Sequence, residues 1–307
     1  MINIFISSSI LICSKKGKIF IYLRDTNLIF CKIKKNKMDL LDKKSYVIMG
    51  ILNVTPDSFS DGGKYFKTED AVNHALRLEE EGADIIDIGG ESTRPKAESV
   101  SVEEECSRVL PVIEKIAKKI KIPISIDTTK SDVAKRALDA GAYMINDISA
   151  GRFDSNMPQI AAEKKCPIIL MHSRKTPKTM QENPYYKDVI LEVKNELLER
   201  ITVFENFGVL KKNIIIDPGI GFAKRLEDNL TILKRLSEFK DMGFPICIGV
   251  SRKSFIGMIT NKNVNERLSG TIAATVFARL GGAKIFRVHD VWQTIDAIKI
   301  VDAINNS

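Results

Sequence analysis

Side chains suited to chemistry stand in this sequence at the ends of apolar runs, one set after each run. They are Asn53, Asp87 with Glu91, Asp127, Asn146 with Asp147, His172, Asp217, Ser251, and Arg287 with His289 and Asp290. The set mixes carboxylates, amides, imidazoles and a guanidinium group, so it offers both hydrogen-bond acceptors and partners for an anion.

Basic and hydroxyl side chains gather in two of these places. The stretch "GGESTRP" supplies Ser92, Thr93 and Arg94, and "RVHD" supplies Arg287 and His289. Guanidinium groups match phosphate oxygens bidentately, so these residues together indicate a phosphate or pyrophosphate site. By itself, "GGESTRP" is equally typical of a hydroxyl-capped turn ahead of a helix.

A third basic stretch, "GVSRKSFIG", places Arg252, Lys253 and Ser254 just before an apolar run. Basic residues beside the free N–H groups of a helix start favour an anion or a polar carbonyl group. The alternative is a solvated Lys/Arg pair at a helix N-cap.

Asp127, Asn146 and Asp217 each follow a strongly apolar run, in "ISIDTTK", "MINDIS" and "IIIDPGIGF". Acceptors beside an amide can hydrogen-bond to the edge of a flat, nitrogen-rich heterocycle. Ligation of a divalent metal is a rival interpretation. N-capping of the following helices is the structural alternative, and "DPG" is also a turn signature.

Two other chemistries find no support in the sequence. The three histidines, His74, His172 and His289, lack the spacing of a zinc site. The stretch "GVSRKS" lacks the second glycine of a nucleophile elbow, and no Ser-His-Asp pattern appears. The sequence therefore offers no obvious carrier for a covalent mechanism.

The elements that must position these residues form a repeating pattern of apolar runs and amphipathic segments. The runs cover residues 46–53, 83–90, 122–127, 142–149, 166–172, 213–219, 244–251 and 283–290. Strands that alternate with helices and are almost continuously apolar predict a parallel sheet covered on both faces. We therefore predict an α/β fold, a (β/α)8 TIM barrel over residues 45–307, whose strand ends meet at one rim. A doubly wound open sheet is the alternative.

Residues 1–44 differ from the rest of the chain. They carry ten lysines and arginines against three acidic residues, and so hold most of the net charge of +8. We expect this short N-terminal extension to be disordered, a hairpin packed on the domain, or sequence upstream of a start at Met38. It has no basic segment before its apolar run and no small-residue cleavage site, which disfavours a secretory signal.

The composition bounds the partners and the compartment. The near-neutral body gives no support to a nucleic-acid surface, and the apolar run near the N-terminus is too short to span a membrane. The five cysteines are scattered without a CxxC motif, so we expect a reduced, cytoplasmic protein.

Eight motifs, in order along residues 45–303, resemble the dihydropteroate synthase family of the pterin-binding (β/α)8 superfamily. They are "MGILNVTPDSFSDGG", "DIGGESTRP", "ISIDT", "INDISAG", "MH", "IDPGIGF", "GVSRKSFIG" and "RVHDV". The resemblance implies a transferase of folate biosynthesis and a target of sulfonamides. Its members join 4-aminobenzoate to (7,8-dihydropterin-6-yl)methyl diphosphate, releasing pyrophosphate and 7,8-dihydropteroate.

The resemblance also implies roles for individual residues. Asp127, Asn146, Asp217 and Lys253 would hold the pterin, and Asp127, Asp217, Lys253 and Arg287 would take part in catalysis. Thr93, Arg94, Arg287 and His289 would bind the diphosphate, and Asn53 would ligate its Mg²⁺. The aminobenzoate would lie near Ser58, Phe59, Arg94, Phe222 and Ser254. Members commonly form homodimers through barrel helices.

A mechanism follows from the amine nucleophile. An aniline nitrogen is unprotonated at neutral pH, so no general base is needed to create the nucleophile. Catalysis then requires stabilisation of the leaving group and of positive charge on the pterin methylene. We expect "NVTPDSFSDGG" to be a mobile loop that closes over the diphosphate, with Gly62 and Gly63 permitting the bend. A rigid, ordered hairpin is the alternative.

Four residues depart from the family's usual pattern: Lys96, Thr129, Lys175 and Ala223. They put loop conformation and sulfonamide sensitivity in question more than the reaction. Two rivals remain, a pterin-dependent methyltransferase acting with a corrinoid protein and a catalytically silent pterin-binding subunit. Neither needs the residues of a diphosphate site, which this sequence has.

Overall fold

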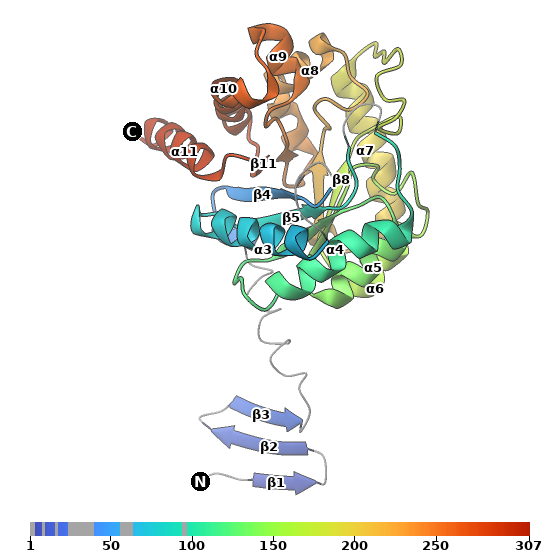
Figure 1. Cartoon of the computed structure of the whole chain (residues 1–307), viewed down its shortest axis with the longest axis vertical. Coiled ribbons are helices and arrows are strands. Elements are labelled where there is room, and N and C mark those ends of the chain that lie inside the picture. The colour runs from blue at the N-terminus through green and yellow to red at the C-terminus, as the bar shows by residue number, and fades with distance from the viewer. Residues whose placement is uncertain (1–3, 8–9, 16–17, 24–39, 56–63, 94–96) are drawn as a thin grey trace. The chain divides into compact units, whose positions relative to one another are not determined.

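The structure is a computed structural model that describes residues 4–7, 10–15, 18–23, 40–55, 64–93 and 97–307. The chain divides into two compact units, Met1–Ser45 and Tyr46–Ser307. Figure 1 shows the elements of each unit. The described strands of the first unit are β1 (Ile4–Ser7), β2 (Ile10–Lys15) and β3 (Lys18–Leu23). They pair antiparallel in that order, and the short helix α2 (Leu40–Lys43) follows them. A hairpin packed on the domain stays a prediction.

The second unit is built on eight parallel strands, each inside one of the predicted apolar runs. They are β4 (Val47–Asn53), β5 (Ile85–Gly89), β6 (Ile124–Asp127), β7 (Met144–Asp147), β8 (Ile168–Met171), β9 (Ile214–Asp217), β10 (Cys247–Ile248) and β11 (Ile285–Val288). Nearly all their residues are buried because helices cover the outer face of the sheet.

The sheet closes into a barrel. Its strand order is β10-β11-β4-β5-β6-β7-β8-β9, and a parallel bridge between Ile216 and Ile246 joins the two ends. Across that seam Ile216 N donates to Pro245 O at 3.0 Å. The predicted (β/α)8 TIM barrel is confirmed, and the open-sheet alternative is wrong.

Helices follow the strands and form the outer layer (Figure 1). They are α3 (Lys64–Glu80), α4 (Val102–Ile116), α5 (Ser131–Ala140), α6 (Met157–Lys164), α7 (Val189–Asn206), α8 (Leu226–Lys234), α9 (Ser254–Thr260), α10 (Leu268–Leu280) and α11 (Val291–Asn305), with 3-10 turns at Lys211–Asn213, Leu236–Met242 and Val264–Glu266.

Helix α4 illustrates why these segments are helical. Val109, Val112, Ile113 and Ile116 recur at spacings of three and four and are fully buried against the barrel. The helix begins after Ser101, whose Oγ accepts from Glu104 N at 3.1 Å. Among the described residues, no helix is both long and apolar enough to cross a membrane.

Candidate active site

The predicted strand-end residues lie at one rim of the barrel, because the eight strands are parallel. Asn53, Asp127 and Asp217 are the last residues of β4, β6 and β9, and Asn146 is the second last of β7. Asp127 pairs in register with Asn146 on β7 and with Gly89 on β5. This rim is where (β/α)8 enzymes place their active sites.

Arg287 links two carboxylates across the rim. Its Nε donates to Asp87 Oδ2 at 2.6 Å and its Nη2 donates to Asp127 Oδ2 at 2.6 Å. Asn146 Nδ2 donates to the same Asp87 oxygen at 3.1 Å. We call Asp87, Asp127, Asn146 and Arg287 the acid cluster. It joins four strands, β5, β6, β7 and β11.

The acid cluster retains unused hydrogen-bonding capacity. Within the described residues Asp87 Oδ1 is buried without a hydrogen-bond partner. Burial raises the pKa of Asp127 to about 7, although Arg287 acts against the shift and Asp87 adds to it. A ligand that donates hydrogen bonds would stabilise the charged form of Asp127.

Asp217 is buried across the rim, and its Oδ1 accepts from Gly219 N at 2.7 Å. Burial raises the pKa of Asp217 to about 6, against that hydrogen bond and the charge of Lys253. Gly219 has a φ of +73°, and a Cβ there would lie 2.0 Å from His172 O. The glycine of "DPG" is therefore required by a close approach of two backbones.

Lys253 stands over an apolar floor. Its Nζ lies 4.1 Å from the centroid of the Phe222 ring. Burial, together with the charge of Arg287, lowers the pKa of Lys253 to about 8. The floor is a cluster of buried side chains: Ile148, Met171, Met180, Phe222 and Ala223. An apolar surface beside a cation and two carboxylates suits a flat heterocycle with polar edges.

The residues predicted to bind an anion lie in different settings. His289 Nδ1 is 3.0 Å from Ser251 Oγ, and burial plus the charges of Arg287 and Arg252 lowers the pKa of His289 to about 3. Arg252 forms an ion pair with Asp290, with Nη2 to Oδ1 at 2.6 Å. Thr93 is half-buried after β5.

The surroundings of Asn53 bear on its expected role as a metal ligand. A Cβ built on Gly89 would lie 3.6 Å from Asp127 Oδ2 and 3.8 Å from Asn53 Oδ1, so both oxygens border the same glycine. An amide oxygen suits Mg²⁺, which commonly takes its other ligands from phosphates and water. The described residues hold no group of three or more His, Cys, Asp or Glu able to bind a metal. Asn53 thus fits a cation that arrives with a phosphate.

Ser58, Phe59, Arg94 and the loop glycines lie outside the described residues, as does Lys96. Ser254 is exposed at the first position of α9. Their proposed roles stay predictions, as does closure of the first loop.

The other departures from the family's pattern have clear settings. Thr129 borders a cavity of about 370 Å³ that also touches Asp127 and Thr93. Lys175 Nζ donates to Glu182 O at 2.6 Å. Ala223 has a φ of +48°, a conformation that favours glycine.

Sequence reasoning assigned no role to Asp87, which the structure places at the centre of the acid cluster. A signal was available, because Asp87 is a charged residue inside the apolar run "IIDIG" and is fully buried. A buried carboxylate needs a partner, and that partner is Arg287, 200 residues away in the sequence.

This fold and rim define a class of protein, the pterin-binding barrel enzymes. Residues 49–289 match the family model described as "Pterin binding enzyme", and the chain belongs to that family.

Within it, the chain is similar to the dihydropteroate synthases. That of Synechocystis is 49% identical over 263 residues, covering 85% of this chain and 91% of the relative. A Clostridium difficile dihydropteroate synthase solved in the presence of pteroic acid matches with a TM-score of 0.81 and 44% identity, covering 85% of this chain and 97% of that one. The Xanthomonas albilineans enzyme with 4-aminobenzoic acid also matches at 0.81 and 44%, covering 87% and 95%.

Proposed function

We propose that this protein is a transferase of folate biosynthesis. It joins 4-aminobenzoate to (7,8-dihydropterin-6-yl)methyl diphosphate and releases pyrophosphate and 7,8-dihydropteroate. The observation that carries the proposal is the acid cluster beside Lys253 and Phe222, at the strand-end rim of a chain 49% identical to a dihydropteroate synthase. Relatives solved in the presence of pteroic acid and with 4-aminobenzoic acid support both halves of the reaction.

The buried acceptors recognise the pterin. Its ring edge presents N–H donors, and Asp127 and Asp217 offer carboxylate oxygens from opposite parts of the rim, with the Asn146 amide beside them. Each charge-assisted hydrogen bond contributes roughly 1.5–3 kcal/mol. Lys253 and Phe222 complete the site with a cation and an apolar ring face.

The same carboxylates assist the chemical step. As the C–O bond to the diphosphate breaks, positive charge develops on the pterin methylene and ring, and anionic Asp127 and Asp217 stabilise it in a buried setting. The aniline nitrogen attacks that methylene carbon as the C–O bond to the diphosphate breaks, and it loses its proton to solvent afterwards. Arg287, His289 and Thr93 are the described candidates for contacts to the leaving group.

We further propose that Asn53 ligates the Mg²⁺ that accompanies the diphosphate. When bound, the ion neutralises charge that develops on the leaving group. The support is the hard amide oxygen of Asn53 beside Gly89 and Asp127, where a phosphate-borne cation needs few protein ligands.

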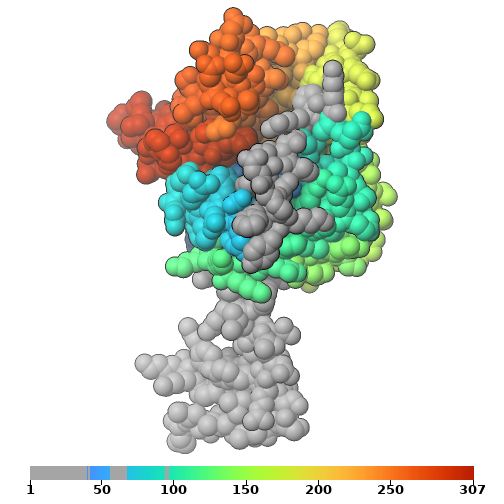
Figure 2. Space-filling view, viewed as in Figure 1, coloured from blue at the N-terminus to red at the C-terminus, as the bar shows by residue number. Residues whose placement is uncertain are grey.

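A homodimer through the last helices is also proposed. Helices α10 and α11 pack side by side (Figure 2, orange and red). They expose large apolar side chains: Phe277, Leu280, Trp292, Ile300 and Ile304. Exposed apolar side chains on two adjacent helices are typical of a surface that another protein covers.

The cysteines bear on the compartment. Cys106, Cys166 and Cys247 are free and buried, which supports a reducing, cytoplasmic setting.

The test is product formation by the purified protein given the pterin diphosphate, 4-aminobenzoate and Mg²⁺, with Asp127→Ala as the control. Dihydropteroate and pyrophosphate should appear in equal amounts and disappear in the control. Pterin binding without product would instead favour a silent binding subunit. Methyl transfer from methyltetrahydrofolate to a corrinoid would favour a methyltransferase.

A further inference from the structure

Lys224 is a fully buried lysine next to the site that no step above uses. It is 2% exposed and lies in the loop 218–225 between β9 and α8. Its Nζ donates to Phe222 O at 3.0 Å, to His172 Nδ1 at 2.9 Å and to His172 O at 3.4 Å. Burial lowers the pKa of Lys224 to about 7, although the charges of Asp217 and Glu196 act against the shift. In its ammonium form the group has three donors, and all of them are satisfied inside the protein.

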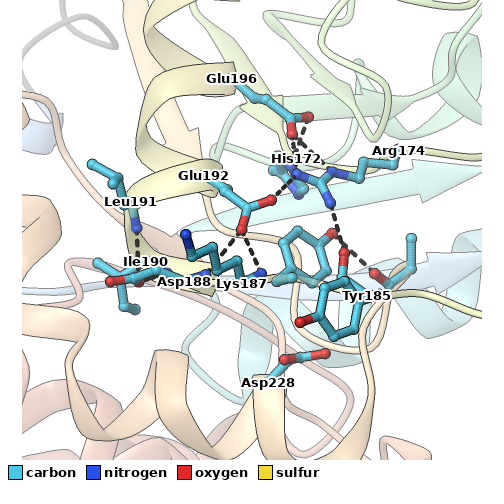
Figure 3. A network of polar contacts seen from close by, with 12 residues as sticks. His172, Arg174, Tyr185, Lys187, Asp188, Ile190, Leu191, Glu192, Glu196 and Asp228 are labelled. Carbon is cyan, nitrogen blue, oxygen red and sulfur yellow. Dashed lines mark hydrogen bonds and ion pairs between the residues drawn. The ribbon is translucent and has the colours of Figure 1, made fainter.

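The partner of Lys224 is a neutral imidazole. His172 Nε2 lies 3.1 Å from Glu196 Oε2 on α7. Burial and the charge of Lys224 lower the pKa of His172 to about 3. These contacts assign the proton to Nε2, which donates to Glu196, and leave Nδ1 to accept from Lys224. Figure 3 shows His172 and Arg174 at Glu196, where Arg174 Nε donates at 2.8 Å.

The backbone between Phe222 and Lys224 is held in a strained conformation. Ala223 has a φ of +48°, which an alanine adopts at a cost and a glycine adopts freely. Two buried hydrogen bonds hold the flanking carbonyls: Lys224 Nζ donates to Phe222 O, and Tyr186 OH donates to Ala223 O at 2.9 Å. Strain persists where the surrounding contacts over-determine a conformation.

The 222–224 turn contributes one side chain, Phe222, to the substrate site. The Phe222 ring belongs to the apolar floor and lies under Lys253 Nζ at 4.1 Å. A change of backbone conformation at Ala223 would move the ring and remove the support of Lys253.

We propose that Lys224 is a positioning residue for this reaction: with Tyr186 it clamps the 222–224 turn so that Phe222 supports Lys253 in the substrate site. The clamp acts on the reaction proposed above and so rests on that function. Lys224 itself touches neither substrate.

Lys224→Met tests the clamp, because methionine has a similar length and donates no hydrogen bond. We expect kcat/KM for both substrates to fall at least about tenfold. The second change, Ala223→Gly, makes the left-handed turn accessible without a clamp. Added to Lys224→Met it should restore kcat/KM at least threefold, with the single Ala223→Gly variant as the reference for that recovery.

The control is Lys194→Met. Lys194 is partly buried and, like Lys224, donates to a carbonyl, Glu238 O, at 2.8 Å, but it lies on α7 and contacts the segment around Glu238 and Asp241. It should leave kcat/KM unchanged. Active wild-type protein in the same assay separates failure of the clamp from failure of the proposed function, since an inactive wild type would overturn the function itself.

A second variant keeps the proposal testable if Lys224→Met does not fold. Tyr186→Phe removes one hydrogen bond and keeps the ring, so kcat/KM should fall about threefold and recover with Ala223→Gly. Wild-type kinetics in either folded variant, or a loss of kcat/KM that Ala223→Gly does not relieve, would overturn the positioning role.

Discussion

Two groups of polar side chains lie at this rim, and they differ in how many of their hydrogen bonds are made within the protein. The acid cluster leaves Asp87 Oδ1 unpaired among the described residues and holds Asp127 with a raised pKa. The second group, Lys224, His172, Glu196 and Arg174, we call the lysine–histidine network. In this network the polar group of each side chain has several hydrogen-bond partners, at donor–acceptor distances of 2.6–3.4 Å.

The difference separates binding from support. A buried polar group without a partner costs free energy, and a ligand that supplies the partner recovers it. A network whose hydrogen bonds are all made within the protein forms no new bond with a ligand. It instead fixes the conformation of the surrounding backbone. The acid cluster is therefore the part that awaits a ligand, and the lysine–histidine network is the part that holds the site in shape.

The largest effect is expected at Arg287, which belongs to the acid cluster and compensates two carboxylates. Arg287→Met leaves Asp87 and Asp127 buried without their cation, so the free energy of unfolding should fall by about 3–5 kcal/mol. Turnover should fall more than about 100-fold. Denaturant unfolding and steady-state kinetics measure the two effects.

Arg279→Met is the matched control, since Arg279 pairs bidentately with Asp302 at 2.7 and 2.8 Å on α10 and α11. It should lower stability less and leave turnover within about threefold, as expected for a partly exposed pair. Equal losses of turnover in both variants would contradict the special role of the acid cluster.

The second prediction separates activity from stability at Asp127. Asp127→Asn removes the charge that faces the ligand, so turnover should fall about 100-fold. The unliganded protein should lose no stability at pH 8. Arg287 still pairs with Asp87, and the substitution removes the buried negative charge of Asp127. A loss of unfolding free energy above about 2 kcal/mol would show that Asp127 is chiefly structural.

The same variant has a pH signature. The pKa of Asp127 is raised from 3.8 to about 7, so between these values the folded protein holds a proton that the unfolded chain has lost. Its contribution to stability is present below pH 3.8 and is lost as pH rises to about 7. In Asp127→Asn, the free energy of unfolding should therefore fall less than in the wild type as pH rises from 3.8 to about 7, as denaturant unfolding at each pH would show. Glu196 has the opposite sign: although burial opposes it, hydrogen bonds from His172 and Arg174 lower its pKa to about 2.

The smallest effect is expected from Glu196→Gln in the lysine–histidine network. The amide keeps an acceptor for His172 but weakens the bonds from Arg174, so stability should fall by about 1–2 kcal/mol. Turnover should stay within about threefold because no ligand contact is lost. A turnover loss as large as that of Asp127→Asn would erase the distinction between the two groups.

Sequence reasoning predicted the barrel and the residues at its strand ends, because apolar runs and their terminal polar residues are local patterns. It did not predict the partners. Arg287 was expected to face a phosphate, yet in the structure it pairs with Asp87 and Asp127, which depends on the register of four strands. The phosphate role stays a prediction.

Lys224 escaped notice for the same reason. Its partner His172 lies 52 residues earlier, and Glu196 approaches from a helix, so no spacing in the sequence relates them. Buried charge networks are properties of packing. Only the left-handed Ala223, where glycine is frequent in the family, offered a local hint that the turn needs outside support.

The barrel's seam has a consequence for amide exchange with solvent. β10 pairs with β11 over two residues and meets β9 at the Ile216–Ile246 bridge, so few hydrogen bonds protect this sector. Local opening requires the least free energy where such hydrogen bonds are few. Asp217 and Lys253 lie on opposite sides of the seam. A pterin that contacts both would stabilise the junction of β9 and β10 against local opening. Binding should then slow exchange of the Cys247 and Ile248 amides more than that of amides in β5 or β6.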